Sequence, residues 1–224
     1  MVTLSERLSA IAALIKKGDR VADIGTDHAY LPIYLRQHGI SPYVLACDIG
    51  ALPLESAKKN VTQSGMDGID FRLCDGLQGI SFDEVDTIVI AGMGGECISG
   101  ILERCAWAKD SGKHFILQPM NSPEELRRFL NGDYTLLSER AVKDAGRIYT
   151  VMEVVAEKSE KRDESTFIYT GLLNPALPLD REFLQKQYKR LRDCADSLKD
   201  VKNEEKRFAS LCEAVVILKN ITEV

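Results

Sequence analysis

Residues 20–32 read RVADIGTDHAYLP. A short apolar run leads into Gly25, and a stretch of helical spacing follows from about residue 28 to residue 38. A glycine after a strand lets the backbone approach a ligand closely, and the N-terminus of the next helix offers free N–H groups. The segment therefore predicts the first strand-turn-helix unit of a nucleotide-binding α/β sheet.

Apolar runs and helical segments alternate over the first 158 residues. Strands are expected at 20–24, 43–48, 71–75, 87–91 and 114–118, and helices at 4–15, 28–38, 52–64, 95–107 and from Ser122 onward, with that serine as the cap. Two further strands, 134–142 and 147–156, are separated by four residues and must pair antiparallel. The pattern predicts a doubly wound, Rossmann-like parallel sheet that ends in an antiparallel hairpin.

The sequence changes character after residue 158. A charged run, 158–164, is expected to form a surface connection. Apolar residues then recur in steps of three and four, at Leu184, Tyr188, Leu191, Ala195 and Leu198, and again at Phe208, Leu211, Val215 and Leu218. We expect a helix over 180–200 packed on a helix over 204–221. This gives an α/β sheet domain, 1–158, and a small coiled-coil-like helical hairpin domain, 159–224.

Composition excludes several classes of protein. The chain has 224 residues and a net charge of −5, so overall charge gives no case for nucleic acid binding. No apolar stretch approaches 18 residues, and the start lacks a basic segment followed by an apolar one, so we expect a cytoplasmic protein without a membrane span. Six cysteines without a C-x-x-C pair are expected to be buried, reduced thiols, and no metal site is expected.

The first turn departs from the glycine pattern of dinucleotide-binding proteins. Asp27 stands where the second glycine would be, and Tyr30 replaces the third. A carboxylate facing a pyrophosphate would cost about 4 kcal/mol at 4 Å and an effective dielectric near 20. The pattern therefore disfavours an NAD-dependent oxidoreductase and favours a cationic ligand such as S-adenosylmethionine. The alternative is that Asp27 merely caps the following helix, and both roles are compatible.

Polar or glycine-rich loops follow the other expected parallel strands. Asp48 lies 23 residues beyond Gly25, where an acid can accept hydrogen bonds from a ribose diol. Asp75-Gly76 would lie beside an adenine amine, or form an ordinary turn. Residues 91–95, Ala-Gly-Met-Gly-Gly, would let a ligand lie against bare backbone, or act as a hinge. All these loops are at carboxyl ends of strands, where open α/β sheets bind ligands.

Three strings carry a resemblance to a known family. DIGTDHAYLP at 23–32, AGMGG at 91–95 and LQP at 117–119 resemble the bacterial tRNA (adenine-22-N1)-methyltransferases, and the resemblance runs nearly full length. It implies a methyltransferase domain with a helical domain, S-adenosylmethionine as cofactor, and methyl transfer to N1 of adenine 22 in tRNA. Class I methyltransferases in general carry more glycines in the first motif and often a polar residue before prolines in the fourth.

These motifs give the candidate site. Donor binding is expected from Asp23, Gly25, Thr26, Asp27, His28, Asp48, Ile49, Asp75, Gly76, Ala91, Gly92, Met93 and Gly94. Adenine N1 already holds a lone pair, so the protein mainly has to align the reactants, and an acceptor near the exocyclic amine would stabilise the developing charge. We expect Asp27 and the Gln118 carbonyl oxygen to be acceptors, with Tyr30 as a stacking or hydrogen-bonding wall.

The RNA partner requires local basic residues. The first 157 residues carry a net charge of −6 and the remainder +1. RNA contacts are expected from Arg127, Arg128, Lys186, Lys189 and Arg190, although each cluster could instead be a solvated helix face. The chain is expected to be a monomer, with dimerisation through the helical hairpin as the alternative. Other hypotheses are a methyltransferase for another RNA or a small molecule, and a non-catalytic donor-binding module whose hairpin contacts a partner.

Overall fold

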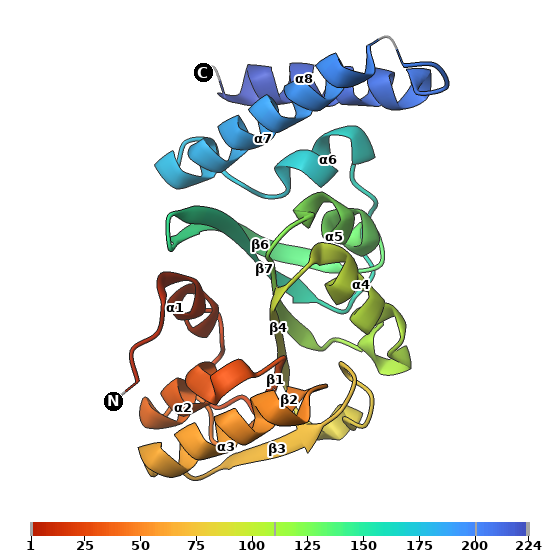
Figure 1. The fold of residues 1–224 in the computed structure, drawn as a ribbon. Helices are drawn as coiled ribbons and strands as arrows, with labels where there is room; N and C mark the ends of the chain where they lie inside the picture. The colour runs from red at the N-terminus through yellow and green to blue at the C-terminus, as the bar shows by residue number, and fades with distance from the viewer. Residues whose placement is uncertain (1, 110, 200, 223–224) are drawn as a thin grey trace.

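A computed structural model describes residues 2–109, 111–199 and 201–222 (Figure 1). Seven strands form one sheet in the order β3-β2-β1-β4-β5-β7-β6. They are β1 (Val21–Ile24), β2 (Val44–Asp48), β3 (Ile69–Leu73), β4 (Thr87–Met93), β5 (His114–Pro119), β6 (Thr135–Asp144) and β7 (Arg147–Val155). Strands β1 to β5 run parallel, and the hairpin β6–β7 joins antiparallel to β5. The predicted doubly wound sheet with a terminal hairpin is confirmed.

Helices cover both faces of the sheet (Figure 1). They are α1 (Glu6–Ala12), α2 (Tyr30–Gln37), α3 (Ala51–Ser64), α4 (Gly95–Glu103) and α5 (Pro123–Leu130), with single turns η1 (Asp27–Ala29), η2 (Phe82–Glu84) and η3 (Ala106–Ala108). The burial of β4 on both faces explains why its sequence is continuously apolar. Ile88 and Ile90 pack into the core under α4 and α5, and Val89 packs into the core under α1, α2 and α3.

The chain ends in a helical region beyond the hairpin (Figure 1). It comprises α6 (Glu164–Thr170), α7 (Pro178–Leu198) and α8 (Glu205–Thr222). The predicted seam is buried between α7 and α8, where Leu184, Leu191 and Leu218 form a separate apolar cluster. Helix α6 was not expected, because it begins inside the charged run. It contributes Ile168 and Tyr169 to the same cluster.

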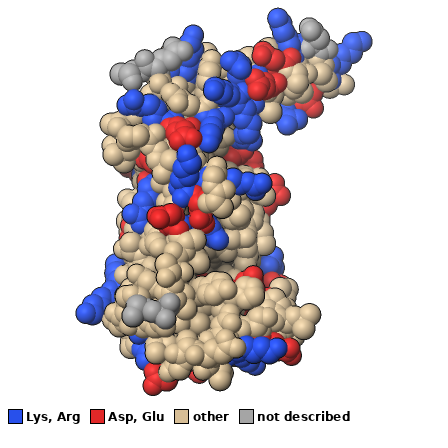
Figure 2. All heavy atoms as spheres, turned by 60° about the vertical axis from the view of Figure 1, so that its left-hand side comes forward, with Lys and Arg blue, Asp and Glu red and all other residues tan. Residues whose placement is uncertain are grey.

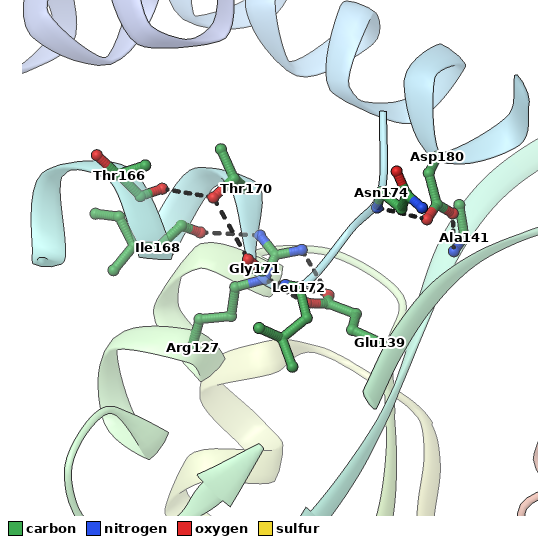
Figure 3. A network of polar contacts seen from close by, with 10 residues as sticks. All are labelled: Arg127, Glu139, Ala141, Thr166, Ile168, Thr170, Gly171, Leu172, Asn174 and Asp180. Carbon is green, nitrogen blue, oxygen red and sulfur yellow. Dashed lines mark hydrogen bonds and ion pairs between the residues drawn. The ribbon is translucent and has the colours of Figure 1, made fainter. Parts of the chain in front are cut away.

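A buried ion pair joins this helical region to the sheet. Arg127 and Glu139 are both completely buried, and Arg127 Nη2 lies 2.6 Å from Glu139 Oε1. Arg127 also donates to the carbonyl oxygen of Ile168, and Glu139 accepts the N–H of Leu172 (Figure 3). The prediction that Arg127 contacts RNA is therefore wrong. Its guanidinium is used inside the protein to hold the segment after α6.

A second buried carboxylate fastens the start of α7. Asp180 accepts the N–H of Ala141 on β6 and the N–H of Asn174 in the preceding loop, at 2.8 and 2.9 Å (Figure 3). Its exposure is only 3 %. Helix α7 is thus bonded directly to β6, and α6 is held through Arg127 of α5. The domain boundary after residue 158 stays a prediction.

Some local expectations differ from the structure. Ser122 does not cap α5, because it adopts a left-handed conformation (φ 48°) and its side chain makes no capping bond. Cys97 and Cys194 are exposed, contrary to the expectation of buried thiols. Within the described residues, no helix has the length and apolar character needed to cross a bilayer. The same residues contain no His, Cys, Asp and Glu cluster suited to a metal ion.

The Arg127–Glu139 pair generates a stability prediction. Arg127→Met leaves a buried carboxylate without its cation, so we expect the free energy of unfolding to fall by about 3–5 kcal/mol. In Arg127→Met/Glu139→Gln the buried charge is gone, and part of that loss should be recovered. Urea denaturation of the wild type and both variants measures this. A single variant as stable as the wild type would contradict the interpretation.

Candidate active site at the carboxyl edge of the sheet

The turn after β1 is shaped by backbone geometry. Gly25 has φ +78°, and a Cβ on it would collide with the Met93 side chain from the glycine loop. The N–H groups of Gly25 and Thr26 both donate to the carbonyl oxygen of Cys47 on β2, at 2.8 and 2.9 Å. The turn is therefore fixed between β2 and β4. The helix predicted over 28–38 begins only at Tyr30, after the single turn η1.

Asp23 lies under this turn, near the end of β1. Its exposure is 7 %, and β1 runs between β2 and β4. Burial raises the pKa of the Asp23 carboxyl to about 6; the nearby Thr26 side chain opposes this, while the negative charge of Asp48 raises the pKa further. A cationic ligand placed beside Asp23 would favour its ionised form.

A cavity of about 340 Å³ opens above Asp23. It is lined by eight of the predicted site residues, namely Asp23, Gly25, Thr26, Asp27, His28, Tyr30, Ala91 and Gly92, and also by Arg7, Leu8 and Leu31. Residues from β1, the following turn and the glycine loop are thus brought together as predicted from their places at the ends of neighbouring strands. The volume is at the lower end of the range for small-molecule pockets.

Asp27 and Tyr30 form one wall of this cavity. The Asp27 side chain is 69 % exposed, and its Oδ1 lies 3.4 Å from His28 Nε2. The alternative that Asp27 caps a helix is wrong, because Thr26 and Ala29 occupy the cap positions of η1 and α2 without side-chain capping bonds. The ring of Tyr30 stacks with that of His28 at 5.5 Å. Asp27 is therefore available to a ligand.

Gln118 lies behind the cavity and is completely buried. Its side-chain oxygen accepts from Arg7 Nη1 at 2.6 Å and from the N–H of Gly92 at 3.1 Å. Its amide nitrogen donates to the carbonyl oxygen of Pro119 at 2.8 Å. The expectation that this oxygen receives a substrate amine is wrong, because both acceptor sites are filled by protein donors. Gln118 instead positions the glycine loop and Arg7.

Arg7 is one of three cavity residues that were not predicted from the sequence, together with Leu8 and Leu31. It projects from α1, bonds to Gln118 and lies 3.6 Å from Asp144 at the tip of β6. Its side chain is 20 % exposed. The available signal was spacing, because Arg7 follows Leu4 by three residues and precedes Ile11 by four, on the apolar stripe of the helix. A charged residue at such a position needs a buried polar partner.

Packing within the protein explains two of the glycines in the loop at residues 91–95. A Cβ on Gly95 would collide with the Ser122 carbonyl oxygen, and one on Gly94 would come within 2.9 Å of Asn121 Oδ1. The N–H of Gly95 also donates to the carbonyl oxygen of Asn121. The last two glycines therefore let the ends of β4 and β5 approach each other. Donor contact by Gly94 stays a prediction.

The remaining candidate donor residues lie outside this cavity, at the ends of β2 and β3. Asp48 Oδ1 accepts the N–H of Gly50 at 2.7 Å, and the side chain of Ile49 is 71 % exposed. Asp75 is half-exposed and lies 3.2 Å from Arg104. Because β2 and β3 pair in parallel, these loops are neighbours at the same edge of the sheet. Donor contact by these residues stays a prediction.

The predicted RNA-binding cations lie on the surface, apart from the buried Arg127. Figure 2 shows Lys and Arg side chains gathered toward the helical end of the molecule, with acidic residues among them. Arg128 pairs with Glu125 and Glu164, Arg190 with Glu124, and Lys186 with Glu182. Lys189 is exposed on α7. RNA contact by these four exposed residues stays a prediction.

The fold and the site define a class of protein. A parallel sheet with a terminal hairpin, whose acidic and glycine-rich loops meet at the carboxyl edge, is the architecture expected of methyltransferases. The sequence profile described as "Methyltransferase domain" matches residues 4–152. The protein thus has a methyltransferase domain.

Relatives define the family. The tRNA (adenine(22)-N(1))-methyltransferase of Bacillus subtilis is 31 % identical over 231 residues, which cover 98 % of this chain and 97 % of that protein. A Streptococcus pneumoniae structure in complex with S-adenosyl-L-methionine is 29 % identical with a TM-score of 0.84, covering 98 % of this chain and 100 % of that one. The structure of M. capricolum TrmK in complex with S-adenosyl-homocysteine is 27 % identical with a TM-score of 0.81, covering 98 % of each chain. This chain belongs to the tRNA (adenine(22)-N(1))-methyltransferase family, as its motifs predicted.

The glycine loop generates a prediction with a matched control. Gly95→Ala should lower the free energy of unfolding by about 1–3 kcal/mol, because the new methyl group meets a backbone oxygen that cannot move freely. Gly100→Ala lies on the same helix, where the nearest atom is the end of the flexible Arg104 side chain at 3.2 Å. It should be neutral or stabilising, since alanine favours helix. Equal effects of the two variants in urea denaturation would contradict this account of the loop.

Proposed function

We propose that this protein transfers the methyl group of S-adenosylmethionine to N1 of adenine 22 in tRNA. The observation that carries the proposal is the pair of carboxylates, Asp23 and Asp27, that line the cavity at the Gly25 turn. Two acids at this turn would repel a pyrophosphate and attract the ammonium and sulfonium of S-adenosylmethionine. Membership of the family supports the same donor, as do solved relatives that hold S-adenosyl-L-methionine or S-adenosyl-homocysteine.

Each part of the donor has a chemical counterpart in the chain. The methyl donor, when bound, supplies an electrophilic methyl carbon on a positively charged sulfur. Asp23 would hold the ammonium, because it is buried at the bottom of the cavity. Asp48 would accept hydrogen bonds from the ribose diol, and Asp75 would accept from the adenine amine. The bare backbone of Gly92 leaves room for an acceptor beside the methyl group.

The acceptor base needs positioning more than activation. As the N1 lone pair attacks the methyl carbon, the carbon–sulfur bond breaks and positive charge develops on the ring. Asp27 would accept a hydrogen bond from the exocyclic amine and so stabilise that charge. Tyr30, which is 46 % exposed at the same wall, would stack against the base. Since the target lies within a folded tRNA, the adenine must be turned out of its stack to reach the cavity.

The product identifies the reaction directly. Purified protein, labelled S-adenosylmethionine and unmodified tRNA transcripts should give N1-methyladenosine by mass spectrometry of the digested RNA. A transcript with guanosine at position 22 should give none. Donor binding without any methylated nucleoside would instead favour a donor-binding module. Methylation that survives the change at position 22 would favour another site or another substrate.

The role of Asp27 can be separated from folding and donor binding. Asp27→Asn should lower kcat about 10²-fold at saturating donor, because the lost charge interaction develops in the transition state. It should leave the affinity for S-adenosylhomocysteine nearly unchanged, because that ligand has no sulfonium and its ammonium is assigned to Asp23. Asp67→Asn, the same change at an exposed surface loop, is the control and should behave as the wild type. Asp27→Asn with wild-type kcat would remove Asp27 from the mechanism.

A further inference from the structure

A second cavity lies between the end of β5 and helix α7. Its volume is about 340 Å³. The apolar part of its wall is formed by Ile148 and Phe183, and the polar part by Glu124, Lys186, Gln187 and Arg190. We call it the interdomain cleft. None of its residues takes part in the donor site described above.

The interdomain cleft adjoins the glycine loop. Its lining begins at Asn121, whose carbonyl oxygen accepts the N–H of Gly95 at 3.0 Å. One residue earlier, the N–H of Met120 donates to the carbonyl oxygen of Met93 at 2.7 Å. Gly92 of the same loop lines the donor cavity. The two cavities are therefore separated by the ends of β4 and β5, so a polymer with one unit in the donor cavity passes close to the cleft.

Glu124 gives the cleft an unused acceptor. Its Oε1 is bonded to Arg190 Nη2 at 2.5 Å, while its Oε2 is buried and has no hydrogen-bond partner. The side chain is 13 % exposed. Arg190 is held in place from the other side, because its Nε donates to Gln187 Oε1 at 2.9 Å. A buried carboxylate oxygen without a donor is unfavourable. Because Glu124 lines the cleft, a rotation of its carboxylate would bring this oxygen to an N–H group of a ligand there.

Two cations stand at the rim of the cleft. Lys186 and Arg190 are about half exposed, and each is paired with a single acid, Glu182 and Glu124 respectively. The pair of Lys186 with Glu182 is exposed and contributes little to stability, so Lys186 can turn to a phosphate at small cost. Arg190 keeps its bonds to Glu124 and Gln187 and offers its remaining N–H groups to the phosphate. The cleft thus combines apolar side chains, an acceptor for N–H groups and cations at its mouth. These are the groups that a nucleotide requires.

The two walls of the cleft are held at a fixed separation. One wall is α7, whose first turn is bonded to β6 through Asp180, and the other includes α5, whose Arg127 is buried against Glu139 of β6 (Figure 3). Both anchors are buried carboxylates that accept backbone N–H groups as well. The cleft is therefore preformed, and a ligand does not have to order it on binding.

We propose that the interdomain cleft binds a nucleotide of the tRNA that neighbours the target adenine. Its base lies against Phe183 and Ile148 and donates an N–H to Glu124, and its phosphate contacts Lys186 and Arg190. The proposal rests on the proposed function, because it takes tRNA as the substrate. It assigns sequence-dependent recognition to Glu124 and sequence-independent attraction to the two cations.

Variants of the cleft test this by their effect on tRNA alone. Glu124→Gln should raise KM for tRNA about tenfold, with kcat and the affinity for S-adenosylhomocysteine within twofold of the wild type. Lys186→Gln changes an exposed position and should weaken tRNA binding. It should also reduce the slope of the logarithm of the binding constant against the logarithm of the salt concentration by about one. Glu103→Gln on α4 is the matched control and should change none of these values.

The base contact is tested with altered transcripts. Amine groups of nucleotides near position 22 are removed one at a time, with inosine for guanosine and purine riboside for adenosine. At one position the wild type should lose about tenfold in kcat/KM, and Glu124→Gln should lose nothing further there. If the losses multiply at every position, or if both cleft variants match Glu103→Gln, the proposal is overturned while the proposed function stands. If wild-type protein methylates no tRNA, the proposed function fails, and this proposal fails with it.

Discussion

The site depends on a carboxylate that is buried near the end of the central strand. Asp23 is 7 % exposed and lies between two parallel neighbours, where a charged group is costly unless a cation faces it. Burial accordingly raises its pKa to about 6. The turn above it is compact, with Gly25 at φ +78° against Met93. A cationic ligand would offset this unfavourable burial, which is why we assign Asp23 to the donor ammonium.

Two buried polar side chains organise the surroundings of this carboxylate. Gln118 joins α1, the glycine loop and β5 through the hydrogen bonds of one amide group, so that Arg7 closes the cavity from the side. Arg127 joins α5 to β6 and to the segment after α6. Gln118 fixes the shape of the donor cavity, and Arg127 holds the helical region (α6, α7 and α8) to the sheet domain. Both side chains bond to other parts of the protein, and neither lines the cavity.

The spacing of apolar residues predicted most of the fold. Continuous apolar runs such as Thr87–Ala91 predicted strands covered on both faces, and the four-residue gap before Arg147 required a hairpin. Local patterns could not supply long-range partners. Arg127 and Arg128 look alike in the sequence, yet only the first meets a carboxylate from β6 and is buried. The role of Gln118 was mispredicted for the same reason, because its side-chain oxygen accepts a hydrogen bond from Arg7, which lies 111 positions away in the sequence.

The site residues that directly follow parallel strands could be predicted from the sequence. Asp23, Gly25, Asp27 and Gly92 line one cavity because parallel strands end at the same edge. Helix α6 was not predicted because its charged start precedes a short apolar segment, of which Ile168 and Tyr169 are buried in one cluster with residues of α7 and α8. The interdomain cleft was missed for a related reason, since its residues come from three separate stretches of the chain.

Proton exchange on binding tests the assignment of Asp23 most directly. The free carboxyl has a pKa of about 6, and a bound ammonium favours the ionised form and lowers that pKa. Binding must therefore release protons near pH 6, by up to about half a proton, and almost none at pH 8, where Asp23 is already ionised. Calorimetry of S-adenosylhomocysteine binding in buffers of different ionisation enthalpy measures this number, with Asp23→Asn as the control. Release at pH 6 that disappears in Asp23→Asn is the predicted result. No exchange at pH 6, or proton uptake, would contradict the account.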